Sequence, residues 1–572
     1  MEFNHLKKNL KKDYTGLKKI KVSLLSDTAS QLLVQAIRGY GYEYSYDLDI
    51  FEADFNQIDR QIMDYSSELY EHEADITIIY ESSHKLLSKF NKLPADQKKD
   101  FAENHIEHLD MLIKTLSAKL KTKIIYLNLA EINDTVYGNY ANKLNNSFVF
   151  QQRKFNYLLM EKAAETPELF ICDLSAIQNL YGKKQLFSPS IYINTEMVLS
   201  IDILPKVAHG ILSIVAAMNG RMNKCIILDL DNTTWGGIIG DDGIENIQVG
   251  TLGIGKAFTE LQYWVKSLQQ RGIIIAVCSK NTESVAKEPF EKHPDMVLRL
   301  DDIAVFVANW ENKADNIRQI QSILNIGFDS MVFLDDNPFE RNIVRDNIPG
   351  ICVPELPQDP AEYLQYLYSL NLFETIAVSN EDAERTKLYQ TESKRVIQQQ
   401  KFTNEDDFLK DLNMLSIVEP FNKFNTPRVA QLSQRSNQFN LRTVRYTDAD
   451  IEALATDNDS YTFSFTLEDK FGDNGLICVI ILKKENDTTL FIDTWFMSCR
   501  VLKRGMEHFV LNTIANFAKD NGFSIVKGEY IPTAKNEMVK DHYKNLGFEE
   551  SGNFWTLNAT DYINKKCFIN KK

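Results

Sequence analysis

Short apolar runs alternate with amphipathic stretches along the first 220 residues. The runs are rich in β-branched residues, which favours strands, and they occupy residues 19–26, 74–80, 122–130 and 168–175. Between them, residues 98–120 carry apolar positions three and four apart, the spacing of a helix that buries one face. Strands that alternate with helices predict a parallel α/β sheet.

The same alternation returns in the middle of the chain with different motifs. We expect helices over residues 256–271 and 312–324, and strands over 225–231, 272–281, 296–300 and 330–338. Polar residues follow several of these apolar runs directly. In an open parallel sheet, ligands bind at the carboxyl ends of the strands, so the middle of the chain is expected to carry a site there.

The last third of the chain is mixed. A polar helical region over 380–414 precedes antiparallel strands within 473–499, and a helix at 504–520, a strand at 523–528 and a helix at 535–546 follow. We therefore predict an α/β protein of three domains. Two three-layer, Rossmann-like domains with parallel sheets (1–220 and 221–375) precede an α+β domain (376–572).

Composition narrows the function classes. The 572 residues carry a formal net charge of -15, which argues against a general nucleic-acid binder. The most apolar stretch, residues 198–218, is interrupted by Asp202, Lys206 and His209, so no membrane span is expected. The seven cysteines are scattered and odd in number, and the first residues lack the apolar core of a signal peptide. These features predict a cytoplasmic protein with reduced thiols.

The candidate chemistry begins at the end of the run "CIILDLDNTT". Side chains alternate along a strand, so Asp229 and Asp231 point the same way. Two carboxylates this close need a cation or a shared proton. Mg²⁺ is the common hard ion that takes oxygen ligands and also holds phosphate oxygens, so we predict a Mg²⁺ site at this edge of the sheet.

Three later positions supply matching groups. Ser279 offers a hydroxyl after a strand, Lys313 offers a point charge at a helix start, and Asp335-Asp336 offers a further carboxylate for the metal. Each group is commonplace alone, and the alternative is that these acids only cap strands and helices. The order of all of them along the chain favours a phosphoryl-transfer site.

This constellation resembles the four motifs of the haloacid dehalogenase superfamily of phosphotransferases. The resemblance implies that Asp229 is the nucleophile that forms an aspartyl-phosphate, and that Asp231 is the general acid and base. Ser279 and Lys313 would hold the phosphoryl oxygens. The Mg²⁺ ligands implied are the Asp229 carboxylate, the Asp231 backbone carbonyl and the Asp336 carboxylate.

The turn "WGGIIGDDG" resembles the FkbH-like branch, phosphatase subfamily IIIC, as do "LDDNPFERNIVR", "QRSNQFNLRTVRY", "WFMSCRVLKRGME" and "GEYIPTAKNEMVKDHYKNLGF". The glycines of this turn are expected to form a tight hairpin flap over the site. Substrate contacts are assigned to Thr233, Trp235, Gly236, Gly237 and Asn281.

The family resemblance implies an SGNH-hydrolase-like first domain, a phosphatase-like centre and an N-acetyltransferase-like last domain. In the first domain, Ser26-Asp27-Thr28 replaces the Gly-Asp-Ser of SGNH hydrolases, and no Asp-x-x-His occurs around 185–210. We therefore interpret this domain as a non-catalytic scaffold or docking module, with Thr28 as a nucleophile as the alternative.

The last domain departs from the acetyltransferase pattern at its phosphate-binding turn. Lys503 stands where that motif has its first glycine, which argues against acetyl-CoA and leaves a pantetheine-bearing ligand, with Arg500 and Arg504 as substrate contacts. Cys499 is interpreted as a buried strand cysteine, with an acyl-accepting thiol as the alternative. Asn437, Gln438 and Asn440 either bind a ligand or satisfy buried backbone groups.

The resemblance implies a Mg²⁺-dependent enzyme that takes a three-carbon unit from a phosphorylated acid, 1,3-bisphosphoglycerate, and delivers a glyceryl group to an acyl carrier protein acting in trans. Three alternatives stay open from the sequence. They are a plain phosphatase of a small phosphorylated metabolite, an acyltransferase that uses the last domain, and a non-enzymatic scaffold.

Overall fold

The computed structural model describes residues 1–378, 385–399, 402–498, 501–533 and 535–572. The chain divides into two compact units, Met1–Ala216 and Ala217–Lys572. The second unit contains two sheets. The described residues of the chain therefore form three separate sheets, and the predicted division into two α/β domains and one α+β domain would give each of them one sheet.

The first unit is built on a parallel sheet in the order β2-β1-β3-β4-β5. Its strands are β1 (Lys18–Ser26), β2 (Tyr46–Glu52), β3 (Ile76–Tyr80), β4 (Lys123–Leu127) and β5 (Leu169–Cys172). Its helices are α1 (Phe3–Asn9), α2 (Gln31–Glu43), α3 (Ile58–Met63), α4 (Glu68–His72), α5 (Ser83–Lys92), α6 (Phe101–Lys119), α7 (Phe148–Glu165), α8 (Leu174–Tyr181), α9 (Lys183–Leu186), α10 (Pro189–Thr195) and α11 (Leu204–Met218).

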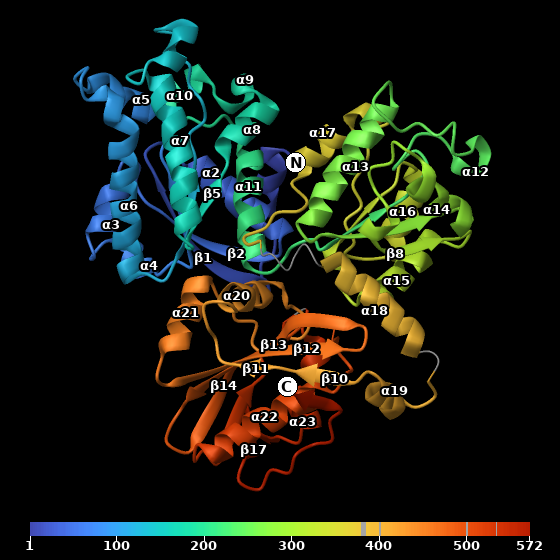
Figure 1. Cartoon of the computed structure of the whole chain (residues 1–572). Helices are drawn as coiled ribbons and strands as arrows, with labels where there is room; N and C mark the ends of the chain where they lie inside the picture. The colour runs from blue at the N-terminus through green and yellow to red at the C-terminus, as the bar shows by residue number, and fades with distance from the viewer. Residues whose placement is uncertain (379–384, 400–401, 499–500, 534) are drawn as a thin grey trace. The chain divides into compact units, whose positions relative to one another are not determined.

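Helices cover both faces of this sheet (Figure 1). Every residue of β3 is buried, which explains why its sequence is a continuous apolar run rather than an alternating one. The helices α3 to α7 contribute to one apolar core with β1, β3 and β4. Elsewhere in the unit, α2 and α11 meet where the rings of Tyr40 and His209 stack with centroids 5.4 Å apart. The predicted strands at 19–26, 74–80, 122–130 and 168–175 are confirmed, and β2 is an addition.

The middle of the chain forms a smaller parallel sheet in the order β8-β7-β6-β9. The strands are β6 (Cys225–Leu228), β7 (Ile274–Ser279), β8 (Ile303–Ala308) and β9 (Met331–Leu334). The helices are α12 (Ile239–Asp242), α13 (Gly255–Gln270), α14 (Glu283–Lys292), α15 (Lys313–Leu324), α16 (Pro338–Asn347), α17 (Tyr363–Leu370) and α18 (Arg385–Gln399).

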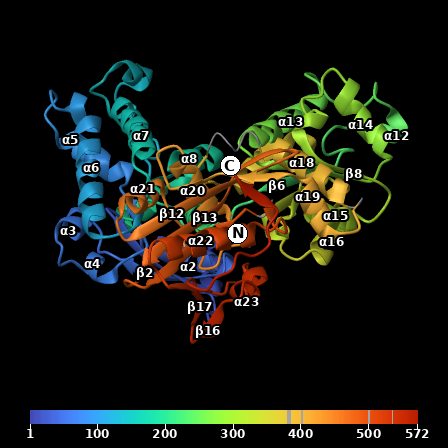
Figure 2. The same cartoon turned by 60° about the horizontal axis from the view of Figure 1, so that its bottom comes forward.

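Helices cover both faces of this sheet, with α13 on one side and α15 on the other (Figures 1 and 2), and each face carries a separate apolar core. One core joins β6 and β7 to α13, α14 and α17, and the other joins the opposite face to α15, α16 and α18. All four residues of β6 are buried, so the strand that leads into Asp229 is enclosed on both sides. This layered packing holds the strand ends rigidly at one edge.

The predicted strand at 296–300 is wrong. The strand of this region begins at Ile303, after a one-turn 3₁₀ helix. The side chain of the buried Gln262 accepts hydrogen bonds from the backbone of Val297 (2.9 Å) and Leu298 (3.2 Å). The apolar side chains Met296 and Leu298 are still buried, so the sequence correctly marks a core segment, but a glutamine and not a neighbouring strand satisfies its backbone.

The last part of the second unit is a mixed sheet in the order β16-β17-β15-β14-β13-β12-β10-β18, with β11 beside β12. Its strands are β10 (Met414–Ser416), β11 (Val418–Glu419), β12 (Ser460–Asp469), β13 (Gly472–Lys484), β14 (Thr489–Met497), β15 (Ile525–Glu529), β16 (Glu549–Ser551), β17 (Phe554–Asn558) and β18 (Ile569–Lys571). Its helices are α19 (Glu405–Asp411), α20 (Thr426–Arg435), α21 (Asp448–Thr456), α22 (Met506–Asp520) and α23 (His542–Asn545).

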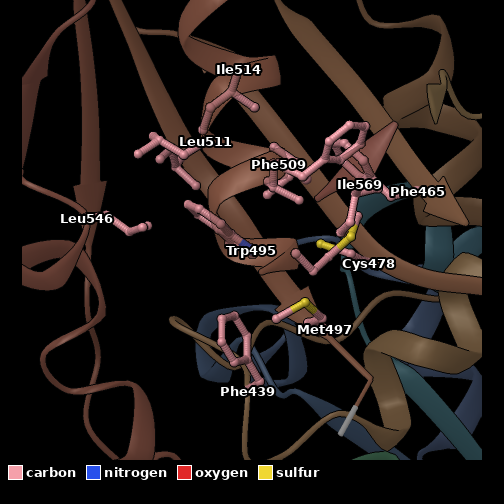
Figure 3. Close-up of a cluster of buried hydrophobic side chains, with 14 of the residues drawn as sticks. Phe439, Phe465, Cys478, Trp495, Met497, Phe509, Leu511, Ile514, Leu546 and Ile569 are labelled. Carbon is pink, nitrogen blue, oxygen red and sulfur yellow. The ribbon is translucent and has the colours of Figure 1, made fainter. Parts of the chain in front are cut away.

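A large apolar core lies between α22 and the central strands of this sheet. Figure 3 shows Trp495, Phe465 and Phe509 within it, and the Trp495 side chain is fully buried. This core confirms the α+β prediction. The predicted helix over 535–546 is only a 3₁₀ turn and the four-residue α23. Within the residues that the structure describes, we find no helix of the length and apolar character needed to cross a bilayer.

Candidate active site

Asp229 lies one residue past β6, at the carboxyl edge of the middle sheet. Its backbone N–H donates to the carbonyl of Leu334 at the end of β9 (2.9 Å), which fixes the main chain at this position. The side chain is buried. Burial raises the pKa of the Asp229 carboxyl to about 6, against the lowering effect of the neighbouring Lys313.

Lys313 bridges two carboxylates at this edge. Its Nζ lies 2.9 Å from Asp229 Oδ1 and 2.6 Å from Asp335 Oδ2. The Asn312 side chain caps α15 by accepting from the N–H of Ala314 (2.7 Å), which sets where the helix and its first lysine begin. Burial lowers the pKa of Lys313, but the two carboxylates outweigh burial and hold it above its usual range. Lys313 is therefore a permanently charged group.

Asp336 is held against the loop that follows Asp229. The Asp336 N–H donates to Thr233 Oγ1 (2.9 Å), and the Thr233 hydroxyl lies 3.4 Å from Asp336 Oδ1. Arg341 donates to the backbone carbonyls of both Asp335 (2.8 Å) and Asp336 (2.7 Å). The Thr233 side chain, assigned above to substrate, is fully buried and joins the two acidic loops.

The carboxylates form a cluster suited to a divalent cation. One oxygen from each of Asp229, Asp335 and Asp336 lies within 4.8 Å of the others. Lys313 pairs with Asp229 and Asp335, and Asp336 adds a third carboxylate beside them, so the cluster has an excess of negative charge that a divalent ion would balance. Asp335 is fully buried and bonded to Lys313 and to the Asn337 N–H. Asp229 and the half-buried Asp336 are therefore the side chains with oxygens to spare for Mg²⁺.

Asp231 occupies a different place from these three. Its Oδ1 accepts from the indole N–H of Trp235 (3.0 Å) and the N–H of Ile239 (3.0 Å). Its Oδ2 accepts from the Asn281 amide (2.9 Å), and that amide also donates to Ser279 Oγ (3.2 Å). Three donors thus orient the carboxylate predicted to move protons, and two of them belong to the turn after β6.

That turn is the predicted flap. Gly236 exchanges two backbone hydrogen bonds with Gln248 (3.0 and 2.7 Å), and a Cβ at Gly236 would lie 2.8 Å from the Phe258 ring. Gly237 has a φ of +92° and donates its N–H to the Asn232 side chain (3.0 Å). The glycines therefore shape the flap, and Trp235 is completely buried beneath it. The structure gives Trp235, Gly236 and Gly237 positioning roles, so their assigned substrate contacts stay predictions.

Trp235→Phe is expected to lower kcat for phosphate release by about 10-fold to 100-fold with KM nearly unchanged. The change removes one hydrogen bond to a carboxylate, which is worth about 1.5–3 kcal/mol, and keeps most of the buried ring. Steady-state kinetics would measure the split between kcat and KM. Trp264→Phe, on the same α13 side of the sheet but remote from Asp231, is the matched control and should leave both constants unchanged. Equal losses in the two variants would contradict the positioning role.

Comparison with known proteins identifies the family. A family model described as "FkbH, N-terminal domain" matches residues 21–216. The chain is also similar to a protein of known structure, the N-terminal part of the protein BF1531 from Bacteroides fragilis. That crystal structure contains a phosphatase domain complexed with Mg, and the two sequences are 55% identical. That match covers 66% of this chain and 100% of that chain, with a TM-score of 0.64. This chain belongs to the FkbH-like family of the haloacid dehalogenase superfamily.

Other similarities are weaker. The FkbH-like chain is 12% identical to the ribosomal-protein-S18-alanine N-acetyltransferase from Escherichia coli, over 26% of this chain and 98% of that chain, with a TM-score of 0.21. It is 12% identical to the spermidine N-acetyltransferase from Vibrio cholerae in complex with CoA and spermine, over 26% and 97% of the two chains, with a TM-score of 0.21. Neither likeness carries an argument about activity. No curated protein matches the chain.

The first unit of the FkbH-like chain carries polar residues at the carboxyl ends of its strands. The Thr28 side chain is fully buried, and its hydroxyl lies 3.4 Å from that of Ser26. Within residues 1–216, all of which the structure describes, no histidine or carboxylate is hydrogen-bonded to Thr28. A nucleophile needs such a base, so the geometry argues against Thr28 as a nucleophile, and the non-catalytic role of this unit stays a prediction.

Asp27 is a buried acid beside the same position. Both of its carboxylate oxygens accept from the N–H of Ser82 (2.9 and 3.0 Å). Burial raises the pKa of Asp27 from 3.8 to about 7, and the Glu81 carboxylate adds to the rise. Glu81 itself accepts from the Tyr126 hydroxyl (3.0 Å) and lies 3.2 Å from His105 Nε2. Folding therefore favours the protonated form of Asp27.

The first unit is expected to lose stability as the pH rises from about 4 to about 7. In this window the unfolded chain has released the Asp27 proton and the folded chain retains it, so the unfolding free energy falls by up to about 4 kcal/mol. Asp27→Asn keeps an acceptor for Ser82 and should remove this dependence. Denaturant midpoints from hydrogen exchange in β1 and β3, at pH 5 and pH 8, measure it. An unchanged pH dependence in Asp27→Asn would refute the assignment.

Arg504, a predicted substrate contact, lies in a buried ion-pair network. Its guanidinium pairs with Glu392 of α18, and its Nη1 lies 3.3 Å from Asp469 Oδ2 at the end of β12. Arg395 pairs with the same two carboxylates, at 2.9 Å from Glu392 and 2.7 Å from Asp469. The network ties α18 to the mixed sheet, and it gives Arg504 a structural partner in place of a ligand. Arg500 and Cys499 lie outside the described residues.

The polar segment around residue 438 mostly satisfies backbone groups. Asn437 donates to the carbonyl of Gly220 (2.7 Å) and accepts from Arg445. Asn440 accepts from the N–H of Thr443 (2.8 Å) and donates to the carbonyl of Ser436 (3.3 Å). The structure therefore favours the structural alternative for Asn437 and Asn440. Asn437 and Gln438 both line a cavity.

Proposed function

We propose that this FkbH-like enzyme is a Mg²⁺-dependent phosphatase or phosphotransferase that works through an aspartyl-phosphate on Asp229. The observation that carries the proposal is the arrangement at the sheet edge. A buried carboxylate lies 2.9 Å from a charged lysine, and a second carboxylate, Asp336, stands beside it. The Mg-bound phosphatase domain of the 55% identical relative supports the metal.

The residues divide the reaction between them. The free oxygen of Asp229 would attack the phosphorus while the bond to the leaving oxygen breaks, and Asp231 would donate the proton that the leaving group needs. Asp231 would then take a proton from the water that opens the aspartyl-phosphate. Lys313 and Ser279 stabilise charge on the phosphoryl oxygens. When bound by Asp229 and Asp336, Mg²⁺ would supply Lewis-acid stabilisation of that charge.

The finer part of the proposal is the substrate. We infer a three-carbon acyl phosphate, 1,3-bisphosphoglycerate, and an acyl carrier protein whose thiol accepts the glyceryl group. Attack of the thiolate on the carbonyl carbon forms a thioester and releases inorganic phosphate, and hydrolysis of the remaining phosphate ester leaves the glyceryl group. Family membership supports this substrate class.

Intact-mass spectrometry tests the substrate directly. The full chain is incubated with 1,3-bisphosphoglycerate, Mg²⁺ and a pantetheine-loaded carrier protein, and a carrier heavier by one glyceryl group is the expected product. Phosphate release with an unmodified carrier would reduce the function to a plain phosphatase. A heavier carrier that forms equally well with Asp229→Asn would instead assign the transfer to another part of the chain.

A further inference from the structure

A cavity of about 350 Å³ lies in the second unit, outside the candidate active site. Its walls come from segments that precede strands of the middle sheet and from the mixed sheet with α20. Apolar walls include Ile274, Phe328, Leu432, Phe439 and Met497. This volume is in the range of sites for small organic ligands.

The charged groups of the lining are mainly cationic. Within the part of the chain that the structure describes, four cations, Lys224, Arg428, Arg435 and Lys535, line the cavity together with one carboxylate, Asp329. Lys224 donates to the Arg435 carbonyl (2.6 Å), and Lys535 pairs with Asp329. Among the described residues of the lining, cations therefore outnumber carboxylates. This concentration is unexpected in a chain whose net charge is -15, and it creates a positive potential in a confined space.

The same potential acts on the carboxylate inside the cavity. Burial raises the pKa of Asp329, but the charges of Lys535, Lys224 and Arg221 outweigh burial and hold it below its usual range. A second anion that enters the cavity would meet the same cations. Gln438 and Ser436 add polar groups at the wall.

A strand-like segment forms the floor of the cavity beside β14. The backbones of Phe439 and Met497 are joined by a hydrogen bond (3.0 Å), as are those of Leu441 and Trp495 (3.1 Å). The N–H of Ile531 donates to the carbonyl of Leu441 from the other side (2.9 Å). Figure 3 shows Phe439 and Met497 close together at one end of the core. The register of β14 with β15 ends at Ile492 and Gly528, and this segment pairs with β14 beyond that point.

The cavity is separate from the candidate active site. Lys224 directly precedes β6 and Asp229 directly follows it, so an extended strand puts about 16 Å between the two positions. The cavity therefore lies at the amino edge of the sheet, and Asp229 lies at the carboxyl edge. A ligand held in the cavity does not reach the nucleophile.

The geometry points to a second ligand site in this cavity, which takes an organic phosphate with an apolar portion. The phosphate would lie among Arg435, Lys224 and Lys535, and the apolar part against Phe439 and Met497. Two sources offer this chemistry, a free phosphorylated metabolite and the phosphopantetheine arm of a carrier protein. The site does not depend on the proposed function, because it shares no residue with the candidate active site.

Calorimetric titration of the full chain tests the site. The titrations are made in EDTA, so that no Mg²⁺-dependent turnover occurs. Phenyl phosphate, a small phosphate ester with an apolar ring, is the probe in one arm, and 4′-phosphopantetheine is the probe in the other. We expect saturable binding of at least one probe, and the probe that binds identifies the source. The double variant Arg435→Gln/Lys535→Gln should weaken that binding at least 10-fold. The double variant Lys519→Gln/Lys544→Gln, an equal charge loss at exposed positions of α22 and α23, should change it less than 2-fold.

A second variant guards against a folding defect in the double variant. Gln438→Trp keeps every cation and fills the cavity with a larger side chain, so it should also abolish binding. Loss of binding in this variant with unchanged phosphatase kinetics would support a separate site. Absence of saturable binding of both probes, or binding that survives the two variants, would overturn the inference.

Discussion

Replacing Asp229 with asparagine is expected to lower kcat for Mg²⁺-dependent phosphate release by about 10⁴-fold or more, because the amide has no charge with which to attack phosphorus. The fold should survive the change. Lys313 keeps its ion pair with Asp335 at 2.6 Å, and the substitution removes one of the carboxylates that compete for it. The measurement is phosphate release under single-turnover conditions with an acyl phosphate and Mg²⁺.

The control for this variant is Asp346→Asn, the same chemical change at an exposed position on α16. It should leave kcat and KM unchanged. Phosphate release from Asp229→Asn at more than a tenth of the unaltered rate would rule out Asp229 as the nucleophile. It would also remove the basis for the proposed function, whereas organic phosphate binding in the second cavity would stand.

Replacing Lys313 with methionine is expected to damage both activity and stability. It leaves Asp229 and Asp335 facing each other in a buried site without a cation. Breaking a buried ion pair in this way costs about 3–5 kcal/mol, so the unfolding free energy should fall by about that amount in EDTA. The loss of phosphoryl stabilisation should lower kcat by about 10³-fold.

Two further measurements separate these effects. Mg²⁺ should restore part of the lost stability, because a divalent ion replaces the missing positive charge between the carboxylates. The double variant Lys313→Met/Asp335→Asn removes one of the repelling charges and should recover most of the unfolding free energy without recovering activity. Denaturant titration with and without Mg²⁺ gives both numbers. A Lys313→Met chain as stable as the unaltered chain would contradict the bridging role.

Sequence reasoning found the groups at the strand ends because their signal is local. Apolar runs indicate buried strands, and a carboxylate directly after such a run must lie at the carboxyl edge of the sheet. The order of Asp229, Ser279, Lys313 and Asp336 along the chain therefore predicted their meeting at one edge, and the structure brings them there. The sequence also led to the parallel sheets and to the mixed character of the last part.

What the sequence did not predict are interactions between distant residues. The strand expected at 296–300 is missing because Gln262, more than thirty positions away, satisfies its backbone. The sequence around Arg504 does not predict its buried ion pairs with Glu392 and Asp469. The substrate contact of Trp235 stays a prediction, but the sequence did not indicate its hydrogen bond to Asp231, which depends on how the turn folds back. Such pairings are set by tertiary packing, which one sequence does not display.

The turn after β6 orients the Asp231 carboxylate, and the same turn is the predicted flap over the candidate active site. Two of the three donors to this carboxylate, the Trp235 indole and the Ile239 amide, belong to that turn. Lifting the turn would remove both donors at once, and the Asp231 carboxylate, which is predicted to carry the proton, would lose its orientation. With the turn lifted, the Asn281 amide would remain as a donor to this carboxylate, and proton transfer by Asp231 is expected to slow until the turn returns.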